Sequence, residues 1–502
     1  MQTRVTETTI IRGGRVLDIR AHRADPADIL VTGDAIAEVG PPGLAAPADA
    51  RTIHADGMLL HSGLINAHTH AHGNLAKGTG DLWTLELLLT AGPSISGGRT
   101  LEERQLSATI GAVEMVLKGC TAAYDLPLEW PAPTPEGLAA VGRAYAEVGM
   151  RAVVAPMLAD RSFFEAIPGL LDVLTPELQK AVEALRPAPW ETSLAGLRAA
   201  LETWTLDRDA VGLAVAPTIP HHCSDDFLRA CADLAKEHGV GLHSHVSESK
   251  VQAIVGLQRY GHTLTAHLDS LGLLGPRFTV AHGVWLDGED MRRLGDHGAS
   301  VAHNPGSNMR LGNGFADMRA MLRHRVNVGV GTDGASCSDN QNVYEAMRLA
   351  SLVSKGRTPD VEQWVTTTEA ALAATEGGAR ALGFEGRLGR LAQGYQADIV
   401  FLDLAHPNWM PVNDPTNQLV HTEDGAAVRH VMIGGRLVVE DRRVTTVDLD
   451  ALRRQAEAAR ERLAAVNAPA RALYERLAPV VGRFCPGLAH MPYHIDRYVG
   501  RS

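Results

Sequence analysis

The chain contains no long hydrophobic run, few cysteines and no excess of positive charge. No apolar stretch in its 502 residues approaches the ~20 residues that a membrane-spanning helix needs. Segment 1–8 also lacks the apolar core of an export signal. These absences argue against a membrane protein and favour a cytoplasmic one.

The five cysteines are scattered and odd in number, which suits a reducing cytoplasm better than a disulfide framework. The 47 basic and 58 acidic residues give a net charge of −11, which disfavours nucleic acids and anionic membranes as partners. We therefore expect a cytoplasmic protein that binds neither nucleic acid nor membrane. The cysteines are Cys120, Cys223, Cys231, Cys337 and Cys485.

The chain is long and has the composition of an ordinary soluble protein, with 45% hydrophobic and 21% charged residues. A chain of 502 residues exceeds the length at which one core usually stops growing. We therefore expect one large barrel with a smaller second domain.

Short β-branched runs separated by Gly, Asp and Pro lie at both ends of the chain. The first set occupies residues 8 to about 60, where Gly13-Gly14 and Gly33-Asp34 are turn signals between antiparallel strands. A similar texture returns in residues 397–402 and 428–439. The two sets together predict one small β domain built from both chain ends.

Between residues 60 and 387, strand-like apolar runs alternate with helical stretches rich in Ala, Leu, Glu and Arg. Eight such runs with helices between them predict a (β/α)8 barrel. A doubly wound open sheet is the alternative on alternation alone, but no Gly-x-Gly-x-x-Gly turn follows the first run. The candidate strands are 63–66, 121–125, 151–155, 211–216, 240–245, 278–282, 300–303 and 327–333.

These patterns divide the chain into three parts. Segments 1–59 and 388–446 form the composite β domain, 60–387 the barrel and 447–502 a C-terminal extension. The extension begins as an Ala/Arg/Glu-rich helix and ends in a segment with Pro and aromatic residues. We expect it to pack against the core or against a neighbouring subunit.

Metal-capable side chains end several of the candidate strands. His68 and His70 lie two residues apart, so a strand directs both imidazoles to one face. Alone, such a pair arises by chance about as often as it binds metal. The C-terminal ends of barrel strands converge, however, and further strands end in His245, His282 and Asp333. His303 ends the seventh, and the set favours a site for Zn²⁺, with Fe²⁺ or Mn²⁺ as alternatives.

Five motifs in this order resemble the amidohydrolase superfamily, and within it the branch of adenosine-, S-adenosylhomocysteine- and guanine-type deaminases and triazine hydrolases. The resemblance runs from about residue 8 to 445 and implies a distorted (β/α)8 TIM barrel with a composite β-sandwich domain. The motifs are Leu64-Ile65-Asn66-Ala67-His68-Thr69-His70, His243-Ser244-His245-Val246-Ser247-Glu248, Val280-Ala281-His282-Gly283, Val301-Ala302-His303-Asn304-Pro305 and Gly331-Thr332-Asp333-Gly334.

The resemblance implies roles for individual residues. The ligands of one divalent metal ion, Zn²⁺ or alternatively Fe²⁺, would be His68, His70, His245 and Asp333. His282 would help to orient or deprotonate the attacking water, with Asp333 as a proton acceptor. Glu248 would carry protons to the substrate ring and the leaving group. His243 is expected to be a packed residue beside this set. The resemblance also implies a homodimer or homotetramer.

These roles predict hydrolytic deamination of a small molecule. Metal-activated water would attack the carbon that bears the amino group of a purine-, pterin-, pyrimidine- or triazine-like heterocycle, and ammonia would leave. One alternative is a related hydrolase that cleaves an amide, an N-alkylamine or a halide. Another is an inactive structural subunit, which the retained ligands and Glu248 argue against.

Two candidate substrate-binding residues, Thr218 and Trp83, lie in loops where the chain departs from the family pattern, and two more lie in the fourth of the motifs above. Thr218 stands where the deaminases usually have a substrate-contacting histidine, so ordinary adenine-nucleoside recognition is in question. Trp83 either stacks on a planar substrate or anchors its loop. His303 and the following Asn304 either contact substrate or fix the seventh-strand loop.

Overall fold

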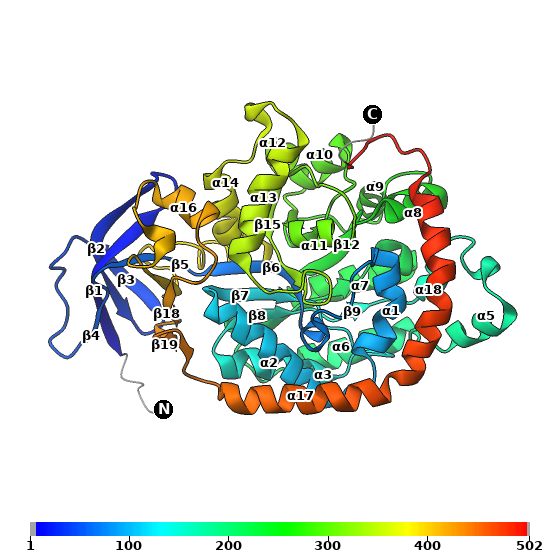
Figure 1. The fold of residues 1–502 in the computed structure, drawn as a ribbon, viewed down its shortest axis with the longest axis horizontal. Coiled ribbons are helices and arrows are strands. Elements are labelled where there is room, and N and C mark those ends of the chain that lie inside the picture. Colours follow the sequence, from blue (N-terminus) through cyan, green and yellow to red (C-terminus); the bar gives the residue numbers. More distant parts are fainter. Residues whose placement is uncertain (1–6, 499–502) are drawn as a thin grey trace.

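A computed structural model of the protein describes residues 7–498. A barrel of strands and helices fills the centre, a twisted sheet lies on one side, and two long C-terminal helices run along the lower and right edges (Figure 1). Within the described residues, no helix is both long and apolar enough to cross a membrane.

The barrel strands run parallel, as predicted. They hydrogen bond in the orders β10-β8-β7-β6-β16 and β12-β13-β14-β15, and β15 returns to contact β6. A bridge between Val215 and Leu242 links the two groups. The strands are β6 (Leu64–His70), β7 (Cys120–Asp125), β8 (Arg151–Val154), β9 (Met157–Leu158), β10 (Val211–Leu213), β11 (Ala216–Pro217), β12 (Leu242–Val246), β13 (Phe278–His282), β14 (Ser300–His303), β15 (Asn327–Val330) and β16 (Asp333–Gly334).

Every residue of β6 is buried, because helices cover the outer face of the barrel and side chains fill its interior. The covering helices are α1 (Leu85–Ser96), α2 (Leu101–Leu117), α3 (Pro135–Val148), α4 (Phe163–Ala166), α5 (Pro176–Glu183), α6 (Trp190–Thr203), α7 (Asp225–His238), α8 (Lys250–Tyr260), α9 (Leu264–Ser270), α10 (Gly288–Asp296), α11 (Pro305–Arg310), α12 (Met318–Arg323), α13 (Val343–Arg357), α14 (Thr367–Leu372), α15 (Gly378–Ala381) and α16 (Pro415–His421).

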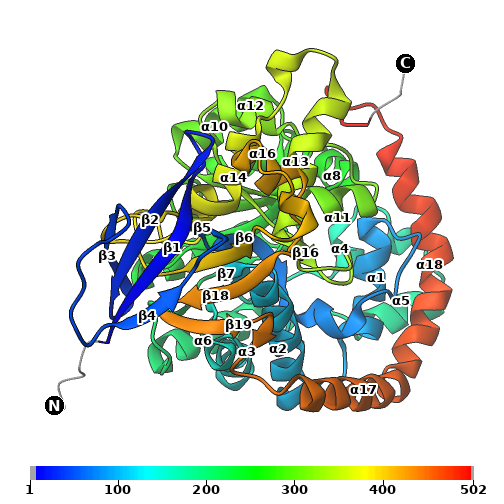
Figure 2. The ribbon, with the colours of Figure 1, turned by 60° about the vertical axis from the view of Figure 1, so that its left-hand side comes forward.

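The second sheet combines strands from both chain ends, as predicted (Figure 2). Its central neighbours are β17 and β5, which pair antiparallel with Ile399 opposite Ser62. Its strands are β1 (Thr8–Asp18), β2 (Arg23–Thr32), β3 (Ala35–Gly40), β4 (Arg51–His54), β5 (Met58–Ser62), β17 (Ile399–Asp403), β18 (Val428–Ile433), β19 (Arg436–Glu440) and β20 (Arg443–Val444).

One predicted turn in this sheet is wrong. Gly13-Gly14 does not reverse the chain but lies inside β1, where the register with β2 shifts between Ile11 and Gly14. Gly13 has φ 79°, so the pair forms a bulge in one long strand. Gly33-Asp34, in contrast, does connect β2 to β3.

The extension forms α17 (Leu449–Val466) and α18 (Ala468–Ala489), which pack on the barrel of the same chain. Helix α17 contacts α2, and α18 contacts α1 and α8 (Figure 1). Leu477, Val481 and Cys485 bury one face of α18 in an apolar cluster with residues of α4, α5 and α8. The extension therefore packs against the core of its own chain, which is one of the two arrangements that we expected.

A buried ion pair joins the barrel to the composite sheet. Arg151 of β8 donates from Nε to Asp398 Oδ2 over 3.1 Å, and both side chains are nearly inaccessible. Asp398 Oδ1 also accepts from the backbone N–H of Gly434 over 2.8 Å. Each charge is therefore compensated by a partner from the other domain.

We expect Asp398→Ala to lower the free energy of unfolding by ~3–5 kcal/mol, because it leaves the Arg151 guanidinium buried and unpaired. Urea unfolding followed by circular dichroism measures the change. Glu237→Ala, which removes an exposed partner of Arg198, is the control and should have little effect. Equal stability of wild type and Asp398→Ala would contradict the bridging role of this ion pair.

Candidate metal centre and active-site cavity

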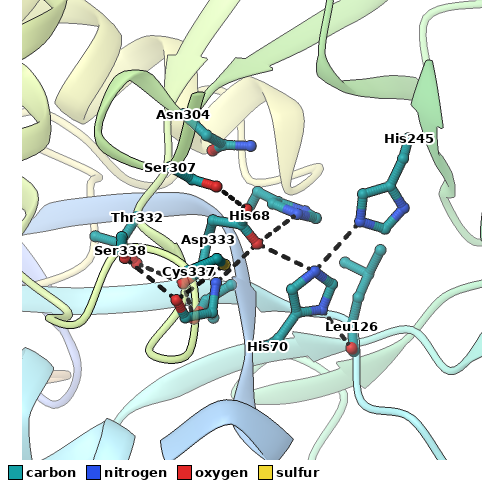
Figure 3. A network of polar contacts seen from close by, with 12 residues as sticks. His68, His70, Leu126, His245, Asn304, Ser307, Thr332, Asp333, Cys337 and Ser338 are labelled. Atoms are coloured by element: carbon teal, nitrogen blue, oxygen red, sulfur yellow. Dashed lines mark hydrogen bonds and ion pairs between the residues drawn. The ribbon is translucent and has the colours of Figure 1, made fainter. Parts of the chain in front are cut away.

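Four of the predicted side chains meet at the C-terminal ends of the barrel strands. His70 Nε2 lies 3.2 Å from His245 Nε2 and 3.2 Å from Asp333 Oδ1. His68 Nε2 lies 3.6 Å from the same Asp333 oxygen. In Figure 3 the His68 and His70 rings point towards the Asp333 carboxylate, and the His245 ring points towards His70. The structure thus brings the four predicted ligands together.

His282 joins this group from the end of β13. Its Nε2 lies 3.8 Å from Asp333 Oδ2 and 3.5 Å from Glu248 Oε2. Two overlapping triads within the described residues have ligand atoms close enough to hold one ion. They are His68, His70 and His245, and His68, His282 and Asp333.

Hydrogen bonds on the far side of three rings fix which nitrogen faces the centre. His70 Nδ1 contacts the carbonyl of Leu126 at 2.7 Å, and His245 Nδ1 contacts that of Thr218 at 2.6 Å. A carbonyl oxygen accepts only, so each Nδ1 carries the proton and each Nε2 presents its lone pair. His282 Nδ1 is held likewise by a side-chain oxygen at 2.9 Å. Such outer contacts are typical of metal-ligating histidines.

The protonation states of His68 and Asp333 also suit a cation. Burial lowers the pKa of His68 to about 3, so its imidazole is neutral. Burial alone raises the pKa of Asp333, but the neighbouring His68 and His70 rings hold it well below its ordinary range, so the carboxylate is ionised. Within the described residues, neither ring nitrogen of His68 nor His282 Nε2 has a hydrogen-bond partner. The donor set therefore fits a divalent metal such as Zn²⁺.

The backbone is strained where these residues leave their strands. His282 has φ 71° and Asp333 has φ 60°, values that non-glycine residues rarely adopt. Ser247, just before Glu248, has φ 53°. Such conformations persist where surrounding contacts impose them, and here they direct side chains into the site.

Glu248 is buried beside the centre. Burial raises its pKa well above the ordinary 4.5, and the nearby carboxylates of Asp333 and Glu86 raise it further. Its Oε1 accepts a hydrogen bond from Asn313 Nδ2 over 3.1 Å. Burial therefore favours the protonated form of Glu248, which can donate a proton to a ligand in the cavity.

A cavity of about 490 Å³ opens onto these groups. Its walls near the centre contain His70, His245, Glu248, His282 and Asp333. Further out the lining is mainly apolar, with Leu85, Leu88, Leu89, Met157, Leu158, Phe163 and Phe164 among its residues.

Some of the predicted substrate-binding residues line the cavity and others do not. Thr218 lines the cavity. Trp83 is not among the lining residues; its ring meets Tyr474 of α18 edge to face at 6.1 Å and covers Gly80. This packing favours the anchoring role that we considered for Trp83.

His303 and Asn304 are buried outside the cavity lining. Asn304 Nδ2 lies 3.4 Å from His282 Nδ1. His243 is buried between the rings of His68 and Tyr124, in neither metal-binding triad. Contact of His303 or Asn304 with substrate stays a prediction.

Sequence reasoning did not assign the roles of several residues that support the site. Ser307 donates to Asp333 Oδ2 over 2.6 Å, and Asn308 supplies the oxygen that holds His282. Asn313 supports Glu248. The backbone carbonyls that orient His70 and His245 cannot be predicted from side-chain identities. The polar residues that follow the His303 motif were a weak indication of side chains that support the site.

The barrel, the converging ligands and the buried Glu248 carboxyl together define a metal-dependent hydrolase. Residues 59–438 match the family described as "Amidohydrolase family". A 5-methylthioadenosine/S-adenosylhomocysteine deaminase from Syntrophobacter fumaroxidans is 35% identical over 86% of this chain and 93% of its own length. A 5′-deoxyadenosine deaminase from Methanothermobacter thermautotrophicus is 30% identical over 90% of this chain and 98% of its own.

Solved structures agree with this assignment. An adenosine deaminase from Xanthomonas campestris with bound zinc gives a TM-score of 0.80 at 26% identity, covering 91% of this chain and 98% of that one. The atrazine chlorohydrolase TrzN from Arthrobacter aurescens TC1, complexed with zinc, also gives 0.80 at 26% identity, covering 90% and 99%.

The chain belongs to the amidohydrolase family. The family and fold that its motifs resembled are confirmed. So is the predicted class, a metal-dependent hydrolytic deaminase of an amino-substituted nitrogen heterocycle.

Proposed function

We propose that this enzyme binds one Zn²⁺ and deaminates the adenine ring of a purine nucleoside whose 5′ end carries an apolar group. The observation that carries the proposal is the buried Glu248 carboxyl, which lies 3.5 Å from His282 Nε2 beside the His/Asp centre and lines the same cavity. Relatives that act on 5-methylthioadenosine/S-adenosylhomocysteine and on 5′-deoxyadenosine support the substrate class.

The residues of the site divide the chemistry among them. His68, His70, His245 and Asp333 would hold the Zn²⁺, which supplies an activated water at neutral pH. Glu248 donates its proton to the ring nitrogen next to the carbon under attack. Asp333, ionised and 3.8 Å from His282 Nε2, accepts a proton from the nucleophile. The water thus loses both of its protons: one passes by way of Asp333 to the amino group, which leaves as ammonia, and the other restores the Glu248 carboxyl, while the oxygen becomes the ring carbonyl.

The apolar outer cavity supports a nucleoside with a hydrophobic 5′ substituent. Leu85, Phe163 and Phe164 line this part, so they would bury such a group. Burial of a 5′-hydroxyl against these apolar side chains would cost hydration, which favours 5′-deoxy and 5′-methylthio nucleosides over adenosine itself.

An ammonia-release assay of the zinc-loaded enzyme tests the proposal. We expect kcat/KM for 5′-methylthioadenosine and 5′-deoxyadenosine to exceed that for adenosine by ~10-fold, the scale at which apolar pockets discriminate. Guanine and an amino-triazine serve as comparison substrates. Release of ammonia from the triazine, with none from the nucleosides, would overturn the substrate class.

A displacement reaction on a triazine is the second candidate. It is favoured by Thr218, which lines the cavity where the deaminases usually have a histidine, and by the similarity to atrazine chlorohydrolase. Chloride and alkylamine release, measured in the same incubations, separates it from deamination.

We further propose that the enzyme acts as a homodimer or homotetramer.

A further inference from the structure

The orientation of Glu248 depends on a residue far away in sequence. Asn313 donates from Nδ2 to Glu248 Oε1 over 3.1 Å, and each side chain is only 2% exposed. The other carboxyl oxygen, Oε2, is the one that faces His282 Nε2 at 3.5 Å. Holding Oε1 therefore turns Oε2 towards the reacting centre.

Asn313 lies in the connection 311–317 between α11 and α12, which has little conformational preference of its own. Gly312 and Gly314 flank it with φ values of 64° and 111°. Its position therefore depends on contacts with other segments. Its backbone N–H donates to Asn308 O over 2.8 Å, and its carbonyl accepts from the indole N–H of Trp285 over 2.8 Å.

Trp285 joins three segments around the acid. Its backbone N–H donates to the carbonyl of Ser247, the residue before Glu248, over 2.8 Å. Its fully buried ring meets Tyr493 and Tyr498 edge to face, with centroids 6.0 and 5.2 Å away. Trp285 thus contacts the segment that precedes Glu248, the 311–317 connection and the C-terminal segment.

The C-terminal segment also contacts the 311–317 connection directly. Arg497, 8% exposed, donates from Nη2 to the carbonyl of Leu286 over 2.5 Å, and its Nη1 lies 3.3 Å from Asp317 Oδ2. Its carbonyl accepts from Phe315 N–H over 2.8 Å. A Cβ on Gly314 would lie 3.0 Å from that same carbonyl oxygen, so the approach requires glycine. Figure 1 shows this dark red segment beside α10 and α12.

We propose that the C-terminal segment 490–498 positions the catalytic acid through Asn313. In this proposal Asn313 and Arg497 are positioning residues: Arg497 holds the 311–317 connection, and the connection holds the amide against Glu248. The proposal rests on the proposed function, because it assigns Glu248 the role of proton donor in deamination. It makes the extension part of the catalytic apparatus, beyond its packing on the barrel.

A double-mutant cycle on the full-length zinc enzyme tests the proposal. We expect Asn313→Ala to lower kcat by ~10–100-fold with KM within about twofold, because a misplaced acid affects the transition state more than binding. Arg497→Ala should lower kcat by ~5–10-fold in the same way. If Arg497 acts through Asn313, the double variant should be no slower than Asn313→Ala alone.

Arg476→Ala, which removes an exposed ion pair between α18 and Glu177, is the matched control and should leave kcat unchanged. Arg497→Lys, which keeps the charge but not the forked geometry, should recover part of the loss and serves if Arg497→Ala does not fold. Zinc content is measured for every variant and should not change.

The outcomes separate this proposal from the one on which it rests. A wild-type enzyme that releases no ammonia refutes the proposed function. A wild type that does so while both single variants keep kcat within about twofold refutes the positioning role. Multiplicative losses in the double variant, or a loss of zinc from Asn313→Ala, would also overturn it.

Discussion

Glu248→Gln should lower kcat by ~10²–10⁴-fold while the protein keeps its metal, since this range is typical of a lost general acid or base. Glutamine has nearly the shape of the protonated acid, and its side-chain oxygen can still accept from Asn313. It cannot deliver a proton to the ring or to the departing amino group. Steady-state ammonia release, with zinc content measured on the same preparations, gives the change.

Glu423→Gln is the matched control for this substitution. Glu423 is also fully buried, but it accepts from Trp409 Nε1 at 2.6 Å and is not among the residues that line the cavity. Its replacement should reduce stability and leave kcat near the wild-type value. Near wild-type ammonia release by a zinc-loaded Glu248→Gln enzyme would show that another group supplies the proton.

The place of the metal site could be predicted from regular strand geometry, whereas the choice of its four ligands came from the family resemblance. In β6 the alternation of side chains places His68 and His70 on one face, and parallel strands bring their C-terminal ends together. His245 and Asp333 follow from the same rule. Local periodicity and topology thus predicted which residues converge, but His282 and His303 satisfy the same rule, and only the family motifs set them apart from the ligands.

The support of the site could not be predicted in the same way. Glu248 and Asn313 are 65 positions apart, and Asn313 lies in an irregular connection that no periodicity describes. The ring of His70 is set by a backbone carbonyl, which every residue possesses. Gly13-Gly14 shows the related limit in the sheet, since a glycine pair suits both a turn and a bulge.

Asp333→Asn should remove both the metal and the activity. Asp333 is the one carboxylate among the predicted ligands, and its Oδ1 lies 3.2 Å from His70 Nε2. The amide loses the negative charge that balances a divalent cation. Changes to outer-shell partners alone cost ~10–100-fold in metal affinity, so loss of this ligand should cost more than ~10²-fold. We expect kcat/KM to fall by more than ~10³-fold, since Asp333 is also the proposed proton acceptor.

Two measurements separate a lost ligand from a lost fold. At zinc concentrations ~100-fold above its Kd, the wild type should gain ~2.7 kcal/mol in free energy of unfolding, seen as a higher Tm. Asp333→Asn should lose this zinc-dependent gain yet unfold cooperatively. Asp290→Asn, at a buried carboxyl bonded to Thr263 outside the cavity lining, should keep the zinc response. A full zinc response in Asp333→Asn would remove Asp333 from the ligand set and leave the histidines as the binding site.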